Sequence, residues 1–117
     1  MKIAYLDCAS GISGDMTLGA LVDAGVDLDA LNVGIGSLGL SNVRLVAETV
    51  KKKGFRATQI TVEHEPEQKH RHLHHITAMI DGSSLSAPQK ELAHRIFRRL
   101  AEAEAKVHNS TIEKVHF

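Results

Sequence analysis

The chain has few cysteines, few aromatic residues and no excess of charge, and each shortage excludes a class of protein. A single cysteine among 117 residues permits no disulfide framework, so a reducing, cytoplasmic setting is expected. The balance of 14 basic and 14 acidic side chains argues against a nucleic-acid binder, because such proteins usually carry a basic excess. Aromatic residues make up 3% of the chain, while hydrophobic residues reach 43% and suffice for a core.

Long apolar runs are also lacking. No stretch approaches the ~20 residues that a membrane-spanning helix needs, so no membrane partner is expected. Asp7 breaks the apolar start of the chain too early for a secretory signal peptide. We therefore expect a cytoplasmic protein in which residues 1–117 form a single domain.

Hydrophobic periodicity and turn residues predict alternating strands and helices. In chain order the expected elements are a strand over 2–7, helices over 14–24 and 28–38, strands over 43–50 and 56–64, helices over 72–81 and from Ser86, and the start of a strand over 112–117. This βαββαβ order indicates an α+β fold of the ferredoxin-like type, with helices on one face of a mixed, mostly antiparallel sheet. Any small α/β sandwich is the alternative.

Apolar side chains that recur on one side of these elements predict the core. Leu45 and Ile60 belong to the alternating apolar faces of the two hairpin strands. On the last helix, Ser86 and Gln89 have the spacing of a capping box. Apolar residues at helical spacing then predict a buried stripe on that helix. The stripe consists of Leu92, Ile96, Leu100, Ala103 and Val107.

The stretch LDCASGISGDM, residues 6–16, joins the first expected strand to the first helix through small residues. A helix N-terminus with bare N–H groups favours an anion such as phosphate. Two carboxylates would repel a bare phosphate, but a divalent cation bridges carboxylate and phosphate oxygens. The candidate phosphate-binding residues are Asp7, Ser10, Gly11, Ser13, Gly14 and Asp15.

Simpler roles exist for single members of this loop. Asp15 is also a favourable first-turn charge, and Ser13 is also an ordinary helix cap. Cys8 is expected to be a small buried residue rather than a nucleophile, because no neighbour in the sequence would lower its pKa. The loop has no Walker lysine, and it does not match the Rossmann glycine pattern or the nucleophile elbow.

A second candidate is the histidine-rich segment HEPEQKHRHLHHI, residues 64–76. Imidazole suits nickel, zinc and copper, and three- and four-residue spacings place histidines on overlapping helix faces. The candidate metal ligands are His70, His72, His74 and His75, with Glu65 and Glu67 as further oxygen donors. A solvated histidine-rich loop is the alternative.

Three motifs together resemble those of the LarC nickel-insertion proteins. YLDCASGISGDMTLGALVDAG (5–25) resembles the opening signature of that family, and HRHL (70–73) its histidine-rich loop leading into R-H-L. IEKVHF (112–117) is similar to the start of the family stretch I-E-x-V-H-F-H-E-V-G. Family chains are several times longer, so the resemblance implies the truncated N-terminal part of a longer protein.

The resemblance implies a cyclometallase of the lyase class. It would insert Ni²⁺ into pyridinium-3,5-bisthiocarboxylic acid mononucleotide with CTP hydrolysis, for the nickel-pincer cofactor of lactate racemase. The C-terminal part of the same protein, where the family handles CTP with Mg²⁺ or Mn²⁺, would be a partner, and the fragment alone would be inactive. Because the last strand is cut short, its open edge predicts a homo-oligomer. A non-catalytic nickel- or zinc-binding module and a purely structural fragment are the alternatives.

Overall fold

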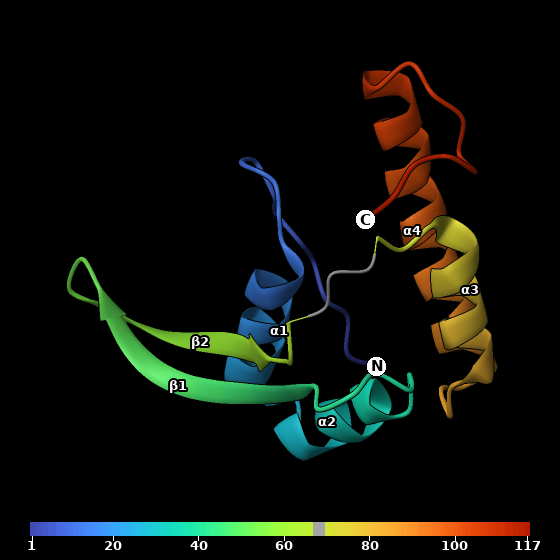
Figure 1. Cartoon of the computed structure of the whole chain (residues 1–117). Helices are drawn as coiled ribbons and strands as arrows, with labels where there is room; N and C mark the ends of the chain where they lie inside the picture. The colour runs from blue at the N-terminus through green and yellow to red at the C-terminus, as the bar shows by residue number, and fades with distance from the viewer. Residues whose placement is uncertain (67–69) are drawn as a thin grey trace.

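The computed structural model describes residues 1–66 and 70–117 and has an α+β fold, which confirms the predicted class (Figure 1). Helices α1 and α2 precede an antiparallel hairpin, and a second pair of helices follows it. The elements are α1 (Gly14–Asp23), α2 (Leu28–Gly36), β1 (Arg44–Lys52), β2 (Phe55–Glu63), α3 (Leu73–Gly82) and α4 (Ala87–Val107). These bounds lie within a few residues of the corresponding predicted elements.

Short polar side chains start the first two helices, as predicted. The Ser13 hydroxyl accepts a hydrogen bond from the Met16 amide at 3.4 Å, and the Asp27 carboxylate accepts one from the Asp29 amide at 3.0 Å. Each bond satisfies an amide that the first turn of a helix leaves unpaired. Gly25 follows α1 with a φ of +100°, a left-handed conformation that suits glycine at a helix end.

The hairpin folds around a two-residue turn. Lys53 and Gly54 have φ values of +49° and +86°, and such a turn matches the right-handed twist of the strands. The register pairs Leu45 with Val62 and Ala47 with Ile60, so these four side chains share one face. Leu45 and Ile60 are only 1% and 4% exposed, which confirms the predicted core face.

Helix α1 packs against β2 and α2 against β1. Close approach of α1 depends on Gly19, because a Cβ atom there would lie 2.8 Å from the Thr58 carbonyl oxygen. Asn32 of α2 bonds the backbone of Leu45 through both its amide oxygen and its amide nitrogen. Two contacts therefore hold the helices against the hairpin: the close packing of Gly19 on β2 and the hydrogen bonds of Asn32 to β1.

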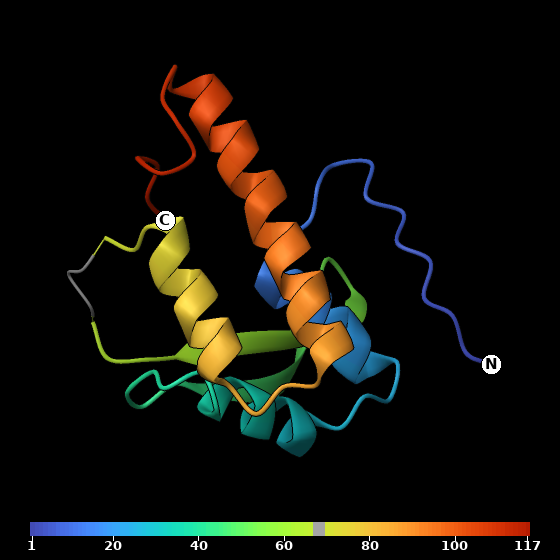
Figure 2. The same cartoon turned by 90° about the vertical axis from the view of Figure 1, so that its right-hand side faces the viewer.

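Helices α3 and α4 pack against each other rather than against the sheet (Figures 1 and 2). The closing segment 110–117 returns along α4 toward the start of α3. Ala101 and Ala105 of α4 form a small buried cluster with Val115. Leu73, Ile112 and Phe117 pack around this cluster. Alanine side chains allow the chain to approach α4 closely on this face.

The two outer strands of the ferredoxin-like arrangement are not formed in the described part of the chain. Residues 2–7 have no ladder partner there, and Ile3 and Tyr5 are 83% and 88% exposed. The segment 112–117 contributes one isolated bridge, between His72 and His116. A strand persists only when neighbouring backbone pairs with it, and the central hairpin is the part of the predicted sheet that has such pairing.

Two burial predictions are wrong. The apolar stripe predicted to be buried on α4 faces solvent, because α3 and the closing segment pack on the alanine face of that helix instead. Cys8 is exposed, since the segment that carries it lies outside the core. No helix among the described residues has both the length and the apolarity to cross a membrane.

Candidate functional site

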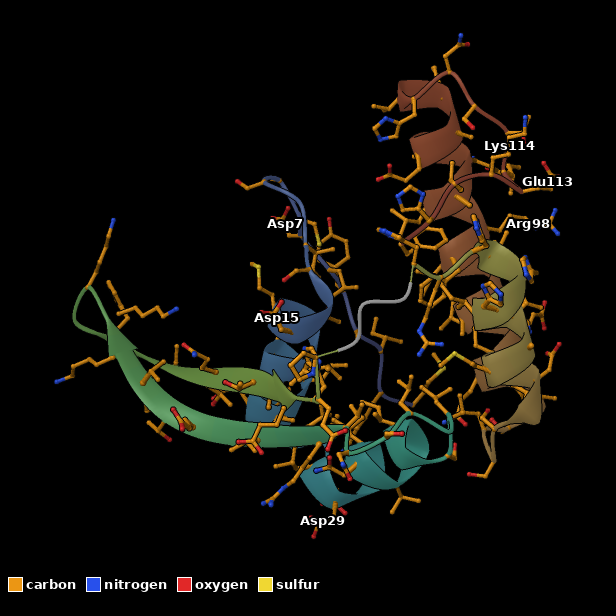
Figure 3. All side chains as sticks on the ribbon, viewed as in Figure 1. Asp7, Asp15, Asp29, Arg98, Glu113 and Lys114 are labelled. Atoms are coloured by element: carbon orange, nitrogen blue, oxygen red, sulfur yellow. The ribbon has the colours of Figure 1, made fainter. Side chains whose placement is uncertain are left out.

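The small-residue loop leads directly into α1. Gly11 closes a tight turn by donating its amide to the Cys8 carbonyl at 2.9 Å, and its φ of +83° suits glycine. Figure 3 shows Asp7 on the extended segment and Asp15 at the start of α1. The six predicted loop residues are all exposed. Their side chains are therefore accessible to a ligand from solvent.

Ser13 and Asp15 interact with each other at the start of the helix. The Ser13 hydroxyl donates to the Asp15 carboxylate, which also accepts from the Met16 amide at 3.0 Å. The Ser13 hydroxyl, then the Met16 amide and, more weakly, the charge of Lys52 lower the pKa of Asp15. The carboxylate is therefore ionised at neutral pH. Ser13 is thus the helix cap and Asp15 the first-turn charge, as the simpler interpretation predicts.

A cleft of about 620 Å³ opens between α1 and the hairpin, beside Asp15. Its cationic groups are Lys52 at the end of β1 and Arg56 near the start of β2. Arg56 is held by an ion pair with Asp23 of α1 at 3.3 Å. The Thr58 hydroxyl donates to the same carboxylate oxygen at 2.7 Å. The cleft therefore places Lys52 near the Asp15 carboxylate at the start of α1 and Arg56 beside Asp23 at the end of that helix.

Sequence reasoning missed Lys52 and Arg56 because they lie about 40 residues after the loop. The one local signal was the basic run at the hairpin turn, residues 51–53. Its relation to α1 depends on the packing of Gly19 against β2. That packing is a tertiary contact that periodicity does not show.

The predicted metal-binding histidines gather at the start of α3. His72 is its N-cap, and the His72 ring Nδ1 lies 2.9 Å from the Val115 carbonyl oxygen. The His75 Nδ1 accepts from the His72 backbone amide at 3.1 Å. The rings of His74 and His75 lie 4.0 Å apart between centroids. With each Nδ1 engaged by the backbone, the Nε2 atoms of His72 and His75 are the nitrogens placed to meet a metal.

His70 contacts His116, whose ring centroid also lies 6.4 Å from that of His72. The rings of His70 and His116 meet edge to face at a centroid distance of 4.6 Å. His116 was not a predicted ligand, although it lies in the IEKVHF motif. Of the two carboxylates proposed as further donors, Glu65 accepts a hydrogen bond from Asn42 at 2.6 Å, and Glu67 lies outside the described residues.

The four histidines do not form a closed metal site. Across residues 1–66 and 70–117, no three histidine, cysteine or acidic side chains converge as metal ligands. Partial desolvation, then the charges of His74, His72 and Arg71, lower the pKa of His75. A lowered pKa keeps the imidazole neutral, which is the form that binds metal. The histidines of this segment therefore suit a metal ion that is bound weakly and keeps open coordination positions.

The two candidate sites occupy different parts of the molecule (Figures 1 and 2). The loop belongs to α1, which packs on the hairpin, and the histidines belong to α3, which packs on α4. The structure therefore groups the loop with Lys52 and Arg56, and His70 with His116, but does not join loop and histidines.

Comparison with known proteins gives one consistent result. The sequence model of the nickel insertion protein family matches residues 4–117. A putative nickel insertion protein of Rhodopirellula baltica is 55% identical over 99% of this chain and 30% of its own length. The pyridinium-3,5-bisthiocarboxylic acid mononucleotide nickel insertion protein of Desulfitobacterium hafniense is 50% identical over 100% of this chain and 29% of its own.

The chain thus spans about 30% of the length of the curated relatives it matches. No solved structure matches it. Because the family match covers nearly every residue, from the loop through the histidines to the closing motif, the chain belongs to the nickel insertion protein family.

Proposed function

We propose that this chain is the N-terminal part of a nickel insertase that acts on pyridinium-3,5-bisthiocarboxylic acid mononucleotide. Ni²⁺ is a substrate of this cyclometallase reaction, which belongs to the lyase class and hydrolyses CTP. The name of the Desulfitobacterium hafniense relative supports the substrate. CTP, with Mg²⁺ or Mn²⁺, is handled by the C-terminal part of the protein, so the chain alone is inactive. The reaction takes place in the cytoplasm.

The observation that carries the proposal is the cleft that runs along α1 from Asp15 to Asp23. A mononucleotide presents a phosphate, and Lys52 and the positive end of the helix dipole favour that anion at the start of α1. Arg56 lies further along the cleft, where Asp23 already pairs with it. The ionised Asp15 opposes a bare phosphate, but it attracts a phosphate that arrives with a divalent cation. The loop and the cleft together therefore form the binding site for the phosphate end of the substrate.

The histidines at the start of α3 hold nickel before its transfer. Imidazole nitrogens bind Ni²⁺ well but release it more readily than a closed set of thiolates. An open group of two or three ligands suits a metal that must leave for the substrate. His70, His72, His74 and His75 are the ligands, and His116 joins His70 through the ring contact between them.

Calorimetric titration of the purified chain tests the phosphate site. We expect Lys52→Ala to weaken mononucleotide binding about tenfold, since a charge-assisted hydrogen bond contributes about 1.5–3 kcal/mol. Arg56→Ala should weaken binding less, because Asp23 at the end of α1 already pairs with Arg56. Lys53→Ala is the matched control, because Lys53 lies in the turn outside the cleft. Equal affinities in all four proteins would contradict the assignment.

A non-catalytic metal-binding module is the second candidate function. The grouping of His72, His74 and His75 at one helix end supports it independently of the cleft. Such a module would bind Ni²⁺ or Zn²⁺ with unchanged affinity in the Lys52 and Arg56 variants, and it would not bind the mononucleotide at all.

The domain and its assembly are also proposals. Residues 1–117 form a single domain of the longer protein, and open backbone at the edges of the two-stranded sheet supports a homo-oligomer. Light scattering over a range of concentrations measures the assembly. A monomer at every concentration would contradict the proposed oligomer.

A further inference from the structure

Helix α4 exposes its large apolar side chains and buries its small ones. Leu92, Ile96 and Leu100 follow one another at four-residue intervals and are 55%, 58% and 43% exposed, and Val107 on the same face is 78% exposed. We call these four residues the α4 stripe. A run of aliphatic side chains along one helix face ordinarily faces a core.

The opposite face of α4 is the one that packs within the chain. Ala101 and Ala105 are 0% and 7% exposed and contact the segment around Val115. At 100° per residue these alanines lie roughly opposite Ile96 on the helix. The α4 stripe therefore points away from α3 and the closing segment, and the described chain leaves it uncovered.

Arginines border the α4 stripe on one side. Arg95 and Arg99 lie next to it on the helical wheel, and Arg98 lies further round toward α3. Arg99 pairs with Glu102 at 3.1 Å, while Arg95 and Arg98 have no ion pair among the described residues. A surface that covers the stripe would meet the unpaired positive charge of Arg95 at its border, so it should carry a carboxylate there.

The N-terminal segment also exposes apolar side chains. In Figure 2, α3 lies on one side of α4 and residues 1–12 run on the other. Ile3, Tyr5 and Leu6 of that segment are 83%, 88% and 56% exposed. Exposed apolar side chains that gather on a surface mark an interaction site, and the α4 stripe is such a group within one helix.

We propose that the α4 stripe is the docking face for the part of a full-length nickel insertion protein that lies outside these 117 residues. The segment matched here makes up only 29–31% of the length of these relatives, so most of each polypeptide is available to cover the α4 stripe. The surface that docks is apolar at its centre and acidic where it meets Arg95. This inference rests on membership of the family and not on either ligand site.

A second copy of the chain fits the α4 stripe less well. Two copies of α4 that meet along the stripe, centred on Ile96, would bring their Arg95 side chains close together, because Arg95 is the adjacent residue, lies at the border and has no ion pair among the described residues. Like charges facing each other across an interface oppose association. The remaining polypeptide of the family carries no such constraint.

The test compares this chain with a full-length protein in which its 117 residues replace the matched segment of the Rhodopirellula baltica relative. Hydroxyl-radical labelling with mass spectrometry measures the accessibility of each side chain. We expect Leu92, Ile96 and Leu100 to be labelled several-fold more slowly in the full-length protein than in the isolated chain. Val33, which is 70% exposed on α2, is the internal control and should be labelled equally in both.

A variant tests the same contact by stability. Ile96→Glu should leave the melting temperature of the isolated chain nearly unchanged, because the side chain is already in water. In the full-length protein it should restore labelling of Leu92 and Leu100 and expose the junction to protease, whereas Val33→Glu should do neither. Equal labelling of the stripe in both contexts would overturn the proposal. So would protection that grows with concentration in the isolated chain, which would identify a second copy as the occupant.

Discussion

The side-chain amide of Asn32 hydrogen-bonds both backbone polar groups of Leu45. Its oxygen accepts from the Leu45 amide at 2.7 Å, and its nitrogen donates to the Leu45 carbonyl at 3.1 Å. The pair reproduces the two bonds that a neighbouring strand would make to that residue. The Asn32 side chain therefore satisfies the backbone hydrogen-bonding groups at the start of β1, where the hairpin has no neighbouring strand.

Removal of this amide should destabilise the domain. In Asn32→Ala both groups of Leu45 lose their partner beside a side chain that is 1% exposed. We expect the free energy of unfolding to fall by about 1–3 kcal/mol, since an unsatisfied buried polar group costs that much. Urea denaturation measures the change. Asn42→Gly is the control, because among the described residues the Asn42 side chain bonds an exposed carboxylate and glycine accommodates its φ of +53°. An equal loss in both variants would contradict the role of Asn32.

The contact between α1 and the hairpin predicts a strong effect at one glycine. In Gly19→Ala the new Cβ would lie 2.8 Å from the Thr58 carbonyl oxygen, so α1 must move away from β2. We expect a loss of about 1–3 kcal/mol, the usual cost of overpacking. Gly36→Ala in α2 meets nothing within 4 Å and should be neutral or stabilising. Thermal unfolding of the two variants measures the contrast.

Asp15 makes the start of α1 sensitive to acid. Hydrogen bonds from Ser13 and Met16 lower its pKa below the ordinary 3.8, so the charged form stabilises the folded state. This contribution is present above pH 3.8 and is lost as the pH falls through the lower pKa of the folded protein. Asp15→Asn should therefore unfold more easily than the wild type at neutral pH, and the difference between them should shrink in acid. A difference that does not change with pH would contradict this account.

Nickel affinity should fall as the medium becomes acidic. Protons compete with Ni²⁺ for imidazole nitrogens as the pH drops through the ordinary histidine range, about 6.5. The lowered pKa of His75 keeps that ring neutral, and so available to a metal, at a lower pH than an ordinary histidine. Calorimetric titration at two pH values measures the dependence.

Substitution of histidines must allow for their role in the fold. His72 and His75 bond the backbone at the start of α3, so alanine there removes a cap as well as a proposed ligand. His74→Ala and His70→Ala should weaken nickel binding without unfolding the domain. His94→Ala is the control, since His94 pairs with Asp81 at 2.8 Å away from the segment. Equal nickel affinity in all these proteins would show that the segment is a solvated loop and not a metal site.

Local elements were predictable from sequence where local chemistry determines them. Ser13, Asp27 and Gly25 mark helix ends, and Gly54 marks the hairpin turn, because capping and left-handed turns depend on neighbours in the chain. The alternation that places Leu45 and Ile60 on one face is local as well.

Burial on α4 was not predictable in the same way. Periodicity identifies the apolar face of a helix but does not say which neighbour covers it. Ala101 and Ala105 take the buried position because α3 and the segment around Val115 pack there. The stripe through Ile96 stays exposed although its pattern is the stronger one. Lys52 and Arg56 escaped prediction for the same reason, because a tertiary contact brings them to α1.

The bridge between His72 and His116 couples the local opening of two segments that are distant in the sequence. It joins the first turn of α3 to the end of the chain, and the Phe117 amide adds a bond to the Arg71 carbonyl at 2.9 Å. Neither segment can detach without breaking bonds to the other, so the two should open as one cooperative unit. Native-state hydrogen exchange would then show equal protection for the amides of His72 and Phe117, although 44 residues separate His72 from His116.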